Sequence, residues 1–498
     1  MPAQRQPVEV GSGHEADGRD PVPDLLVTGG TVVTDGTSCL ADVAVVGEQV
    51  AAVGDPGSLG HDARRVLDAA GCLVVPGGVD PHVHYSLAFG AVCSETQDYS
   101  PAAAIGGTTT VIDFALCLPP GGLHDAVEAK RAEAEGRMAV DWGLHAILAG
   151  PEIGFEVLEE IGDVVAGGVP TIKTFTTYGW KVDDGHRWGI MREVADAGGM
   201  SLLHAEDDDL ASWLTRKYLR EGKVHGAYIS ETRNALVEEA AVRRAMLLAE
   251  RSGSALYVLH MAAASGVEAL AEGRARGLAF YGETLTPYLS FTADDLWHGG
   301  DRGLLWNNYP TLKHQADQEV LWAALADDRL QVVASDHFST TVADHLEKMG
   351  TRVDGMCAGH ANVELRVPVS YHLGVAGGRL GVERWVDVVA TNPARLMGLH
   401  PKKGTVRAGA DADLVVFDPS ASWTVRAEDL HMAADYSCWE GWEVQGRVRT
   451  TVLRGSVVAQ DGEFVGDAGG GRFLRRHLPG DVVDGTALRA ARPLAAAT

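Results

Sequence analysis

The sequence predicts an α/β protein with a (β/α)8 TIM-like barrel and a small β-sandwich domain built from both ends of the chain. Short β-rich runs lie near both chain ends. Between them, strand-like runs alternate with helix-like segments, which is typical of parallel strands joined by helical crossovers. The chain of 498 residues is also too long for one compact core, so two domains are expected.

The β-rich segments consist of apolar runs separated by turn residues. They lie at residues 25–28, 31–34, 41–46 and 50–53, and again at residues 412–417, 448–453 and 456–459. Runs of this length and composition are typical of antiparallel strands. We therefore assign residues 24–75 and 394–465 to the small β-sandwich domain.

The two outermost segments lack this pattern. Residues 1–23 are polar and mixed in charge, without an apolar signal-peptide core, and we expect them to be flexible. Residues 466–498 are expected to form an irregular tail, which either packs on a neighbouring subunit or is disordered.

Residues 76–393 are assigned to the barrel. Its eight candidate strands begin with a run that continues to His84, and they lie at residues 73–84, 108–114, 142–148, 171–176, 201–206, 255–261, 278–283 and 331–336. Helix-like segments rich in Ala, Glu and Arg lie at residues 123–138, 231–251 and 266–276. In such barrels the functional groups gather at the C-terminal ends of the strands.

Composition excludes several classes of partner. With 46% hydrophobic and 22% charged residues, the chain has an ordinary globular composition. Its formal net charge of -26 argues against nucleic acid or an anionic membrane as a partner. No run approaches the ~18 apolar residues of a membrane span. The six cysteines are scattered without a Cys-x-x-Cys pair, which favours reduced thiols and a cytoplasmic location.

His82 and His84 follow the apolar run that opens the barrel. Alternate residues of a strand point to one face, so this pair can direct two imidazoles at one metal ion. An open coordination position there would activate water. A His-x-His pair alone is weak evidence, because many such pairs lie idle on surfaces.

Four further polar side chains end other candidate strands: Lys173, His204, His260 and Asp336. Each histidine taken singly is more often a hydrogen-bonded core residue than a ligand. Their coincidence with the His-x-His pair at one rim of a barrel predicts a metal centre.

Lys173 has two readings, because an ammonium ion would be repelled by metal ions. It either pairs with a carboxylate at the rim, or its neutral amine has captured carbon dioxide to form a carbamate that bridges two metals. The second reading gives complete ligand sets. One ion would have His82, His84, Lys173 and Asp336, and the other would have Lys173, His204, His260 and a hydroxide.

The chain resembles the hydantoinase/dihydropyrimidinase family of the amidohydrolase superfamily over residues 24–478. The similarity lies in Pro76-Gly-Gly-Val-Asp-Pro-His-Val-His84, Lys173-Thr-Phe-Thr-Thr-Tyr178, Glu283-Thr-Leu-Thr-Pro-Tyr-Leu289 and Lys403-Gly-Thr-Val-Arg-Ala-Gly-Ala-Asp-Ala-Asp-Leu414. The resemblance implies an active hydrolase and a homotetramer. It also implies two divalent metal ions, zinc being expected, held by His82, His84, carbamylated Lys173, His204, His260 and Asp336.

The same resemblance implies two catalytic roles. Tyr178 would donate a hydrogen bond to the oxyanion, which typically stabilises such an intermediate by a few kcal/mol. Asp336 would shuttle the proton between the attacking water and the leaving nitrogen. The alternative for Tyr178 is an aromatic residue that only packs at the rim.

Departures from the family pattern concern the substrate. Ala358 occupies the place of an expected asparagine, and Tyr309 begins Tyr309-Pro-Thr-Leu-Lys313 where the family usually has Ser-Pro-Pro-Leu-Arg. The family makes these substrate contacts largely through backbone groups, so catalysis is expected to survive both changes. Leu87 and Phe89 are expected to line the substrate side-chain pocket, with simple packing as the alternative.

The leading functional hypothesis is a cyclic amidohydrolase. A metal-bridging hydroxide would open a hydantoin, a dihydropyrimidine or a related cyclic ureide or imide to an N-carbamoyl amino acid. Allantoinase or dihydroorotase activity is the alternative, although Ser86 stands where dihydroorotases carry a carboxylate-binding arginine. A non-catalytic scaffold is the remote alternative, since the predicted ligand set is complete.

Overall fold

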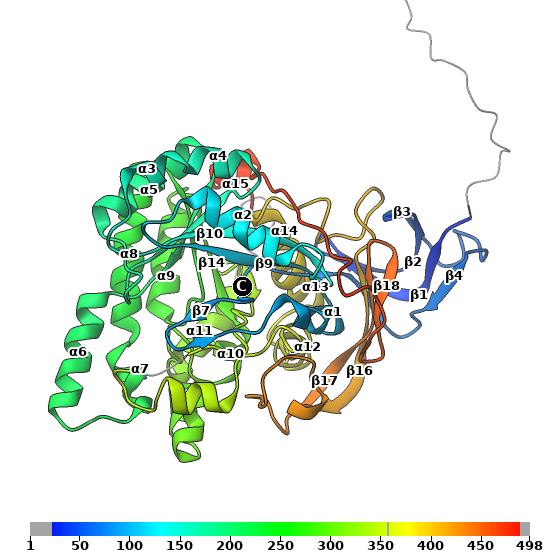
Figure 1. The fold of residues 1–498 in the computed structure, drawn as a ribbon. Helices are drawn as coiled ribbons and strands as arrows, with labels where there is room; N and C mark the ends of the chain where they lie inside the picture. The colour runs from blue at the N-terminus through cyan, green and yellow to red at the C-terminus, as the bar shows by residue number, and fades with distance from the viewer. Residues whose placement is uncertain (1–21, 356–357, 489–498) are drawn as a thin grey trace, which may run out of the picture.

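The computed structural model describes residues 22–355 and 358–488. A parallel barrel forms the larger part of the molecule, and a sheet built from both chain ends lies beside it (Figure 1). The predicted fold class is therefore confirmed. The flexible segment predicted for residues 1–23 lies outside the described residues, apart from Val22 and Pro23.

Within the described residues, the sheet of the small domain has nine strands. From the N-terminal side come β1 (Leu25–Thr34), β2 (Thr37–Val46), β3 (Gln49–Gly54), β4 (Arg65–Asp68) and β5 (Leu73–Pro76). From the C-terminal side come β16 (Leu414–Thr424), β17 (Glu443–Leu453), β18 (Ser456–Gln460) and β19 (Glu463–Phe464). The antiparallel pairing of β5 with β16 joins the two groups, and Figure 1 shows the blue and orange strands side by side. A buried cluster that includes Val27, Val43 and Leu414 packs this domain.

The barrel sheet contains eight parallel strands that neighbour one another in sequence order. They are β6 (Gly78–Asp80), β9 (Thr108–Cys117), β10 (Asp141–Leu148), β11 (Thr171–Phe175), β12 (Met200–His204), β13 (Ala255–Val258), β14 (Phe280–Leu285) and β15 (Val332–Ala334). A short antiparallel hairpin, β7 (Ala88–Phe89) and β8 (Val92–Cys93), follows the first strand.

The predicted strand over residues 73–84 is wrong as one element. Its first part is β5, which belongs to the small sheet, and its second part is β6, which opens the barrel. Gly77 separates them, and a Cβ there would lie 2.1 Å from Thr109 Oγ1. Because both sheets bury this stretch, the apolar pattern runs through the domain junction without a break.

Helices surround the barrel. The helices are α1 (Pro101–Ile105), α2 (Leu123–Ala134), α3 (Phe155–Glu159), α4 (Ile161–Ala166), α5 (Asp184–Asp196), α6 (Asp208–Arg220), α7 (Ile229–Thr232), α8 (Ala235–Ser252), α9 (Ala264–Ala275), α10 (Thr286–Ser290), α11 (Gln315–Ala326), α12 (Arg366–Tyr371), α13 (Val382–Val386), α14 (Asn392–Leu396) and α15 (Gly480–Val483). The longest, α8, begins where the Asn234 side chain accepts from Leu236 N and ends at left-handed Gly253, as helix caps commonly do. Within the described residues, no helix is both long and apolar enough to cross a bilayer.

The described part of the C-terminal tail packs on the barrel of its own chain. Leu474 N donates to Trp142 O at 2.7 Å, and the fully buried Arg476 side chain donates to Leu144 O and to Thr171 Oγ1. These contacts fix the tail to the N-terminal halves of β10 and β11. Contact of this tail with a neighbouring subunit stays a prediction.

A buried charge cluster joins the small domain to the barrel. Lys403 Nζ lies 2.6 Å from Asp141 Oδ2, 2.9 Å from Asp411 Oδ2 and 2.8 Å from Asp413 Oδ2. Asp141 begins β10, while the other two carboxylates precede β16, and Arg454 also pairs with Asp141. Burial alone would lower the pKa of Lys403, but the carboxylates, Asp413 first, outweigh it and raise that pKa above its ordinary value.

Lys403→Ala should strongly destabilise the fold, because it leaves three buried carboxylates with Arg454 as their remaining close cation. Breaking a buried ion pair on one side typically costs about 3–5 kcal/mol, and calorimetry should show a clearly lower unfolding temperature. Lys402→Ala is the matched control, since the Lys402 side chain is 63% exposed and 3.9 Å from Asp411. Equal unfolding temperatures for the two variants would contradict the structural role of this cluster.

Candidate metal centre and active site

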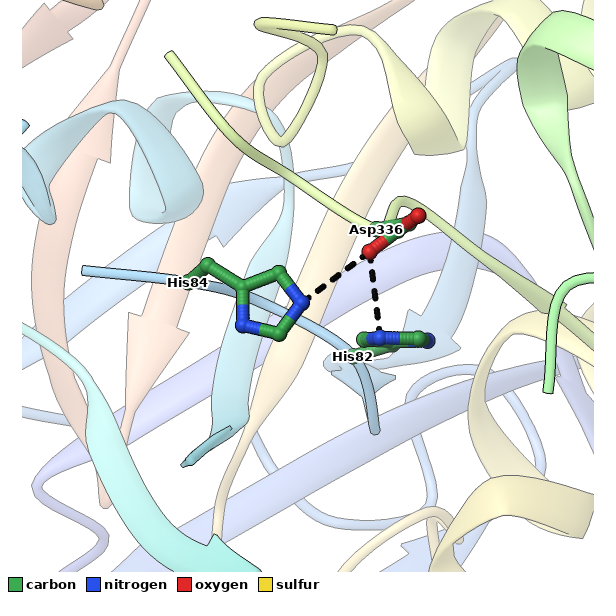
Figure 2. A group of neighbouring side chains, drawn as sticks. All are labelled: His82, His84 and Asp336. Atoms are coloured by element: carbon green, nitrogen blue, oxygen red, sulfur yellow. Dashed lines mark ion pairs between the residues drawn. The ribbon is translucent and has the colours of Figure 1, made fainter. Parts of the chain in front are cut away.

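Closure of the barrel brings the first three predicted ligands together. Val83 and His337 form a parallel bridge between the chain segments that follow β6 and β15. Asp336 Oδ1 consequently lies 3.0 Å from His82 Nε2 and 3.1 Å from His84 Nε2 (Figure 2). All three side chains are buried. Asp336 has a positive φ of 49°, a conformation that non-glycine residues adopt only when their surroundings enforce it.

A buried carboxylate reinforces this closure. Asp80 Oδ1, at the end of β6, accepts hydrogen bonds from His82 N at 3.3 Å and from Ser335 N at 3.2 Å. The Ser335 hydroxyl in turn donates to His82 O at 3.1 Å. Arg366 Nε lies 3.4 Å from Asp80 Oδ2 and balances its charge.

The other three predicted ligands complete the group. Lys173, in the middle of β11, places Nζ 3.2 Å from His82 Nε2. His204, the last residue of β12, places Nδ1 3.0 Å from His260 Nε2. The His260 ring centroid lies 5.3 Å from that of His82. The structure thus brings all six residues to one place inside the barrel.

The chemistry of these groups fits a divalent metal ion. His82, His84 and Asp336 each offer a ligand atom, and these atoms lie within 4.8 Å of one another. Burial lowers the pKa of His82, His84, His204 and His260 below the ordinary histidine value, so the imidazoles are neutral, as metal ligands must be.

Lys173 is buried without a carboxylate partner. In the part of the chain that the structure describes, no carboxylate oxygen lies within 4.0 Å of its Nζ. Its neighbours include the rings of Phe114, at 4.3 Å, and Phe175, at 5.0 Å. Burial lowers the pKa of Lys173 to about 8. The reading of Lys173 as a rim lysine paired with Asp or Glu therefore lacks its partner.

Two carboxylates that sequence analysis did not identify support these ligands. Glu283 Oε1, on β14, lies 2.5 Å from His82 Nδ1, and Glu206 Oε2 lies 2.9 Å from His204 Nε2. Carboxylates behind ligating histidines orient the rings and select their tautomers. Both residues end candidate strands of the sequence, at residues 201–206 and 278–283, so the same strand-end reasoning could have found them.

Tyr178 lies at the same cavity and is bound to Glu206. Its hydroxyl donates to Glu206 Oε2 at 2.7 Å, and its φ is 65°. Arg233 Nη1 lies 3.0 Å from the same carboxylate oxygen, and its guanidinium lies 4.7 Å from the centre of the Tyr178 ring. Burial raises the pKa of Tyr178 well above its ordinary value, so the phenol keeps its proton and acts as a donor.

A small inner cavity of about 70 Å³ adjoins these groups. It is lined by five of the six predicted ligands and by all five residues expected to contact substrate: Tyr178, Tyr309, Ala358, Leu87 and Phe89. Asn308, which sequence analysis did not identify, also lines it and donates from Nδ2 to Asp336 Oδ2 at 3.1 Å. A larger cavity of about 570 Å³ beside Glu364 and Trp423 shares no lining residue with this one.

The fold and this cluster define a barrel hydrolase of the amidohydrolase type. The model of the Amidohydrolase family matches residues 293–459. The chain is 37% identical to a D-hydantoinase from Geobacillus stearothermophilus over 91% of this chain and 96% of that protein. It is 36% identical to a D-hydantoinase from Streptomyces coelicolor over 91% and 97%.

Solved structures show the same relationship. The structure of dihydropyrimidinase from Brevibacillus agri has a TM-score of 0.87 and 34% identity, over 91% of this chain and 98% of that one. The D-hydantoinase from Bacillus sp. AR9 has a TM-score of 0.86 and 36% identity, over 91% and 99%. The chain belongs to the hydantoinase/dihydropyrimidinase family of amidohydrolases. This membership confirms the predicted class of enzyme, a hydrolase of cyclic amides.

Divalent zinc or manganese should raise the unfolding temperature of metal-free protein, because the ion binds the folded cluster and not the unfolded chain. Ligand at about 100 times its Kd stabilises by about 2.7 kcal/mol, and scanning fluorimetry measures the shift. His84→Asn should reduce it. His186→Asn is the control, because His186 pairs with Asp183 at the start of α5. If metal raised the unfolding temperature of both variants equally, the ion would bind at a site that does not include His84.

Proposed function

We propose that this protein opens the ring of a hydantoin, a dihydropyrimidine or a related cyclic ureide or imide. Water adds to a ring carbonyl and the carbonyl carbon–nitrogen bond breaks. A ureide ring then gives an N-carbamoyl amino acid, and an imide ring gives a half-amide. The observation that carries the proposal is the convergence of six ligand-type side chains beside one small cavity. The names of the relatives and their coverage of nearly the whole chain support the substrate class.

We further propose that the six residues hold two divalent ions, with zinc the expected metal. His82, His84 and Asp336 would hold one, and His204 and His260 the other, with carbamylated Lys173 shared between them. Neutral imidazoles and carboxylates suit zinc. When bound, such ions polarise a carbonyl and lower the pKa of water, so that water becomes nucleophilic near neutral pH.

A carbamate on Lys173 would need a neutral amine and a site without a competing carboxylate. Burial lowers the pKa of this lysine, and no described carboxylate pairs with it. The carbamate would replace a cation by an anion among the histidines, which favours bound cations. These features support the modification over an unmodified ammonium group.

Asp336 is proposed to move the proton. Its Oδ1 faces the two histidines, while its Oδ2 accepts from Asn308 at the edge of the cavity. The carboxylate stays ionised, because its pKa lies well below the ordinary value. Asp336 would take a proton from the attacking water and return it to the leaving ring nitrogen, while Asn308 holds the carboxylate in orientation.

Tyr178 is proposed to donate to the carbonyl oxygen as negative charge develops there. A preorganised donor of this kind commonly contributes about 3–4 kcal/mol. In the structure its hydroxyl donates to Glu206, so the phenol must exchange that acceptor for the substrate oxygen. Arg233 stays on Glu206 and would leave that carboxylate with a partner after the exchange.

The lining of the inner cavity favours this function over the alternatives. The described lining contains no arginine to bind the carboxylate of dihydroorotate. Ser86 Oγ, at the position of the dihydroorotase arginine, donates to Gln97 Oε1 at 3.2 Å. The complete set of ligand-type side chains argues against a non-catalytic scaffold.

Two further assignments concern the assembly and the location of the protein. We propose a homotetramer, because the resemblance implies one. We also propose a cytoplasmic location, which agrees with the scattered cysteines of the sequence.

The zinc-loaded enzyme should hydrolyse hydantoin, dihydrouracil or phenylhydantoin, giving a product one water heavier that mass spectrometry identifies as the N-carbamoyl amino acid. Dihydroorotate and allantoin should react at least tenfold more slowly. Asp336→Asn serves as the inactive control, because it removes the proposed base. The proposal would be refuted if the enzyme, with full metal occupancy, left the ring of every cyclic ureide and imide intact.

Lys173→Ala should lose both bound metal and turnover, because the shared anionic ligand is gone. Acetate or propionate added with zinc should restore part of each, since a free carboxylate can occupy the vacated space. Metal analysis and product formation are measured together. Lys181→Ala is the control, because Lys181 is half-exposed and pairs with Asp208. Unchanged metal content and turnover in Lys173→Ala would contradict the proposal of a carbamate on Lys173.

A further inference from the structure

A second, larger cavity adjoins the inner one. It has a volume of about 410 Å³, whereas the inner cavity has about 70 Å³. Phe89, Tyr178 and Tyr309 line both cavities. We call the larger one the outer chamber. Its wall includes α6, which lies at the edge of the molecule (green, lower left in Figure 1).

The three shared aromatic rings form a partition between the cavities. The ring centroids of Tyr178 and Tyr309 are 5.3 Å apart, and those of Phe89 and Tyr178 are 6.1 Å apart. Elsewhere around the inner cavity, Leu87 and Phe338 belong to a packed apolar cluster. The outer chamber therefore lies directly beyond these rings, where a long substituent on a ring held in the inner cavity could extend.

The walls of the outer chamber suit a flexible aliphatic arm. Helix α6 contributes Ala211, Ser212, Thr215, Arg216 and Leu219. Residues 353–355 contribute Val353 and the Asp354 carboxylate. Methyl and methylene groups alternate with hydroxyl groups along this wall, so it can contact a hydrocarbon chain and still solvate a polar end.

Arg216 is the available charge of the outer chamber. Arg233 also lines it but is paired with Glu206, and Asp354 is bound by Arg352 at 3.0 and 3.2 Å. Arg216 is exposed, and among the described residues no carboxylate lies within ion-pair distance of it. An available guanidinium inside a chamber of a protein with a net charge of -26 points to an anionic ligand group.

We propose that the outer chamber binds the ring substituent of the substrate, and that Arg216 recognises an anion at its end. The preferred substrate class is then a cyclic ureide whose ring carbon carries an aliphatic arm that ends in a carboxylate or a comparable anion. This inference rests on the proposed ring-opening function and adds the specificity of its substituent.

Three substrates test the proposal: hydantoin with a carboxybutyl arm on its ring carbon, the corresponding carboxamide, and unsubstituted hydantoin. The wild-type enzyme should have a higher kcat/KM for the carboxylate than for the carboxamide, and high salt should reduce the difference. Arg216→Gln should lower kcat/KM for the carboxylate by roughly three- to fivefold and leave the other two substrates unchanged.

Two more variants control the experiment. Arg220→Gln removes a charge one turn further along α6, outside the chamber lining, and should change none of the three rates. Thr215→Trp fills the chamber and should lower kcat/KM for both substrates that carry an arm, while hydantoin turnover is retained.

The outcomes separate the two levels of the proposal. If hydantoin is turned over but the carboxylate and carboxamide substrates react at equal rates, Arg216 does not have the proposed role. An equal effect of Arg216→Gln and Arg220→Gln leads to the same conclusion. If Thr215→Trp leaves the turnover of both arm-bearing substrates unchanged, the outer chamber is not their binding site. If none of the three rings is opened, the proposed function itself fails, and the inference fails with it.

Discussion

The parallel bridge between Val83 and His337 is the contact on which the active site depends. β6 and β15 are three-residue strands at the two ends of an otherwise continuous sheet. The sheet closes beyond them, where His337 N donates to His82 O at 3.3 Å and His84 N donates to His337 O at 2.8 Å. The same backbone bonds that close the barrel therefore place two imidazoles and the Asp336 carboxylate on one point.

Three residues of the site also have a strained backbone. Asp336, His260 and Tyr178 all have positive φ angles, which cost about 1–3 kcal/mol each in a non-glycine residue. Such conformations persist because the surrounding bonds leave no alternative. At the opposite end of the barrel strands, the Lys403 cluster fixes β10 to the segment before β16. Stability and chemistry thus lie at different ends of the barrel, as is usual for this fold.

The strand-end rule could find the six ligand-type residues from sequence because each lies on, or directly after, a strand with a clear apolar pattern. It could not find Asn308, which reaches Asp336 from a loop. Glu206 ends a candidate strand, but its contacts with Tyr178 and Arg233 join three separate segments and could not be read from the sequence. The sequence also misplaced the first barrel strand. Both sheets bury residues 73–80, so the apolar pattern of the sequence does not change at Gly77, where one strand ends and the next begins. Lys403 and Asp141 are 262 positions apart, a separation at which periodicity carries no information.

Tyr178 lines both cavities, and its proposed role would couple them energetically. Its phenol donates to an ionised carboxylate in the resting structure, and a hydrogen bond to a charged group contributes about 1.5–3 kcal/mol. If this phenol is to stabilise the transition state, the substrate must supply at least that much to draw it from Glu206. A substituent that crosses the aromatic partition contacts the same ring and can supply it. Binding energy from a remote part of the substrate would then be used to place the donor. On this argument the outer chamber affects kcat as well as KM, because the side chain that separates the cavities is also the proposed oxyanion donor.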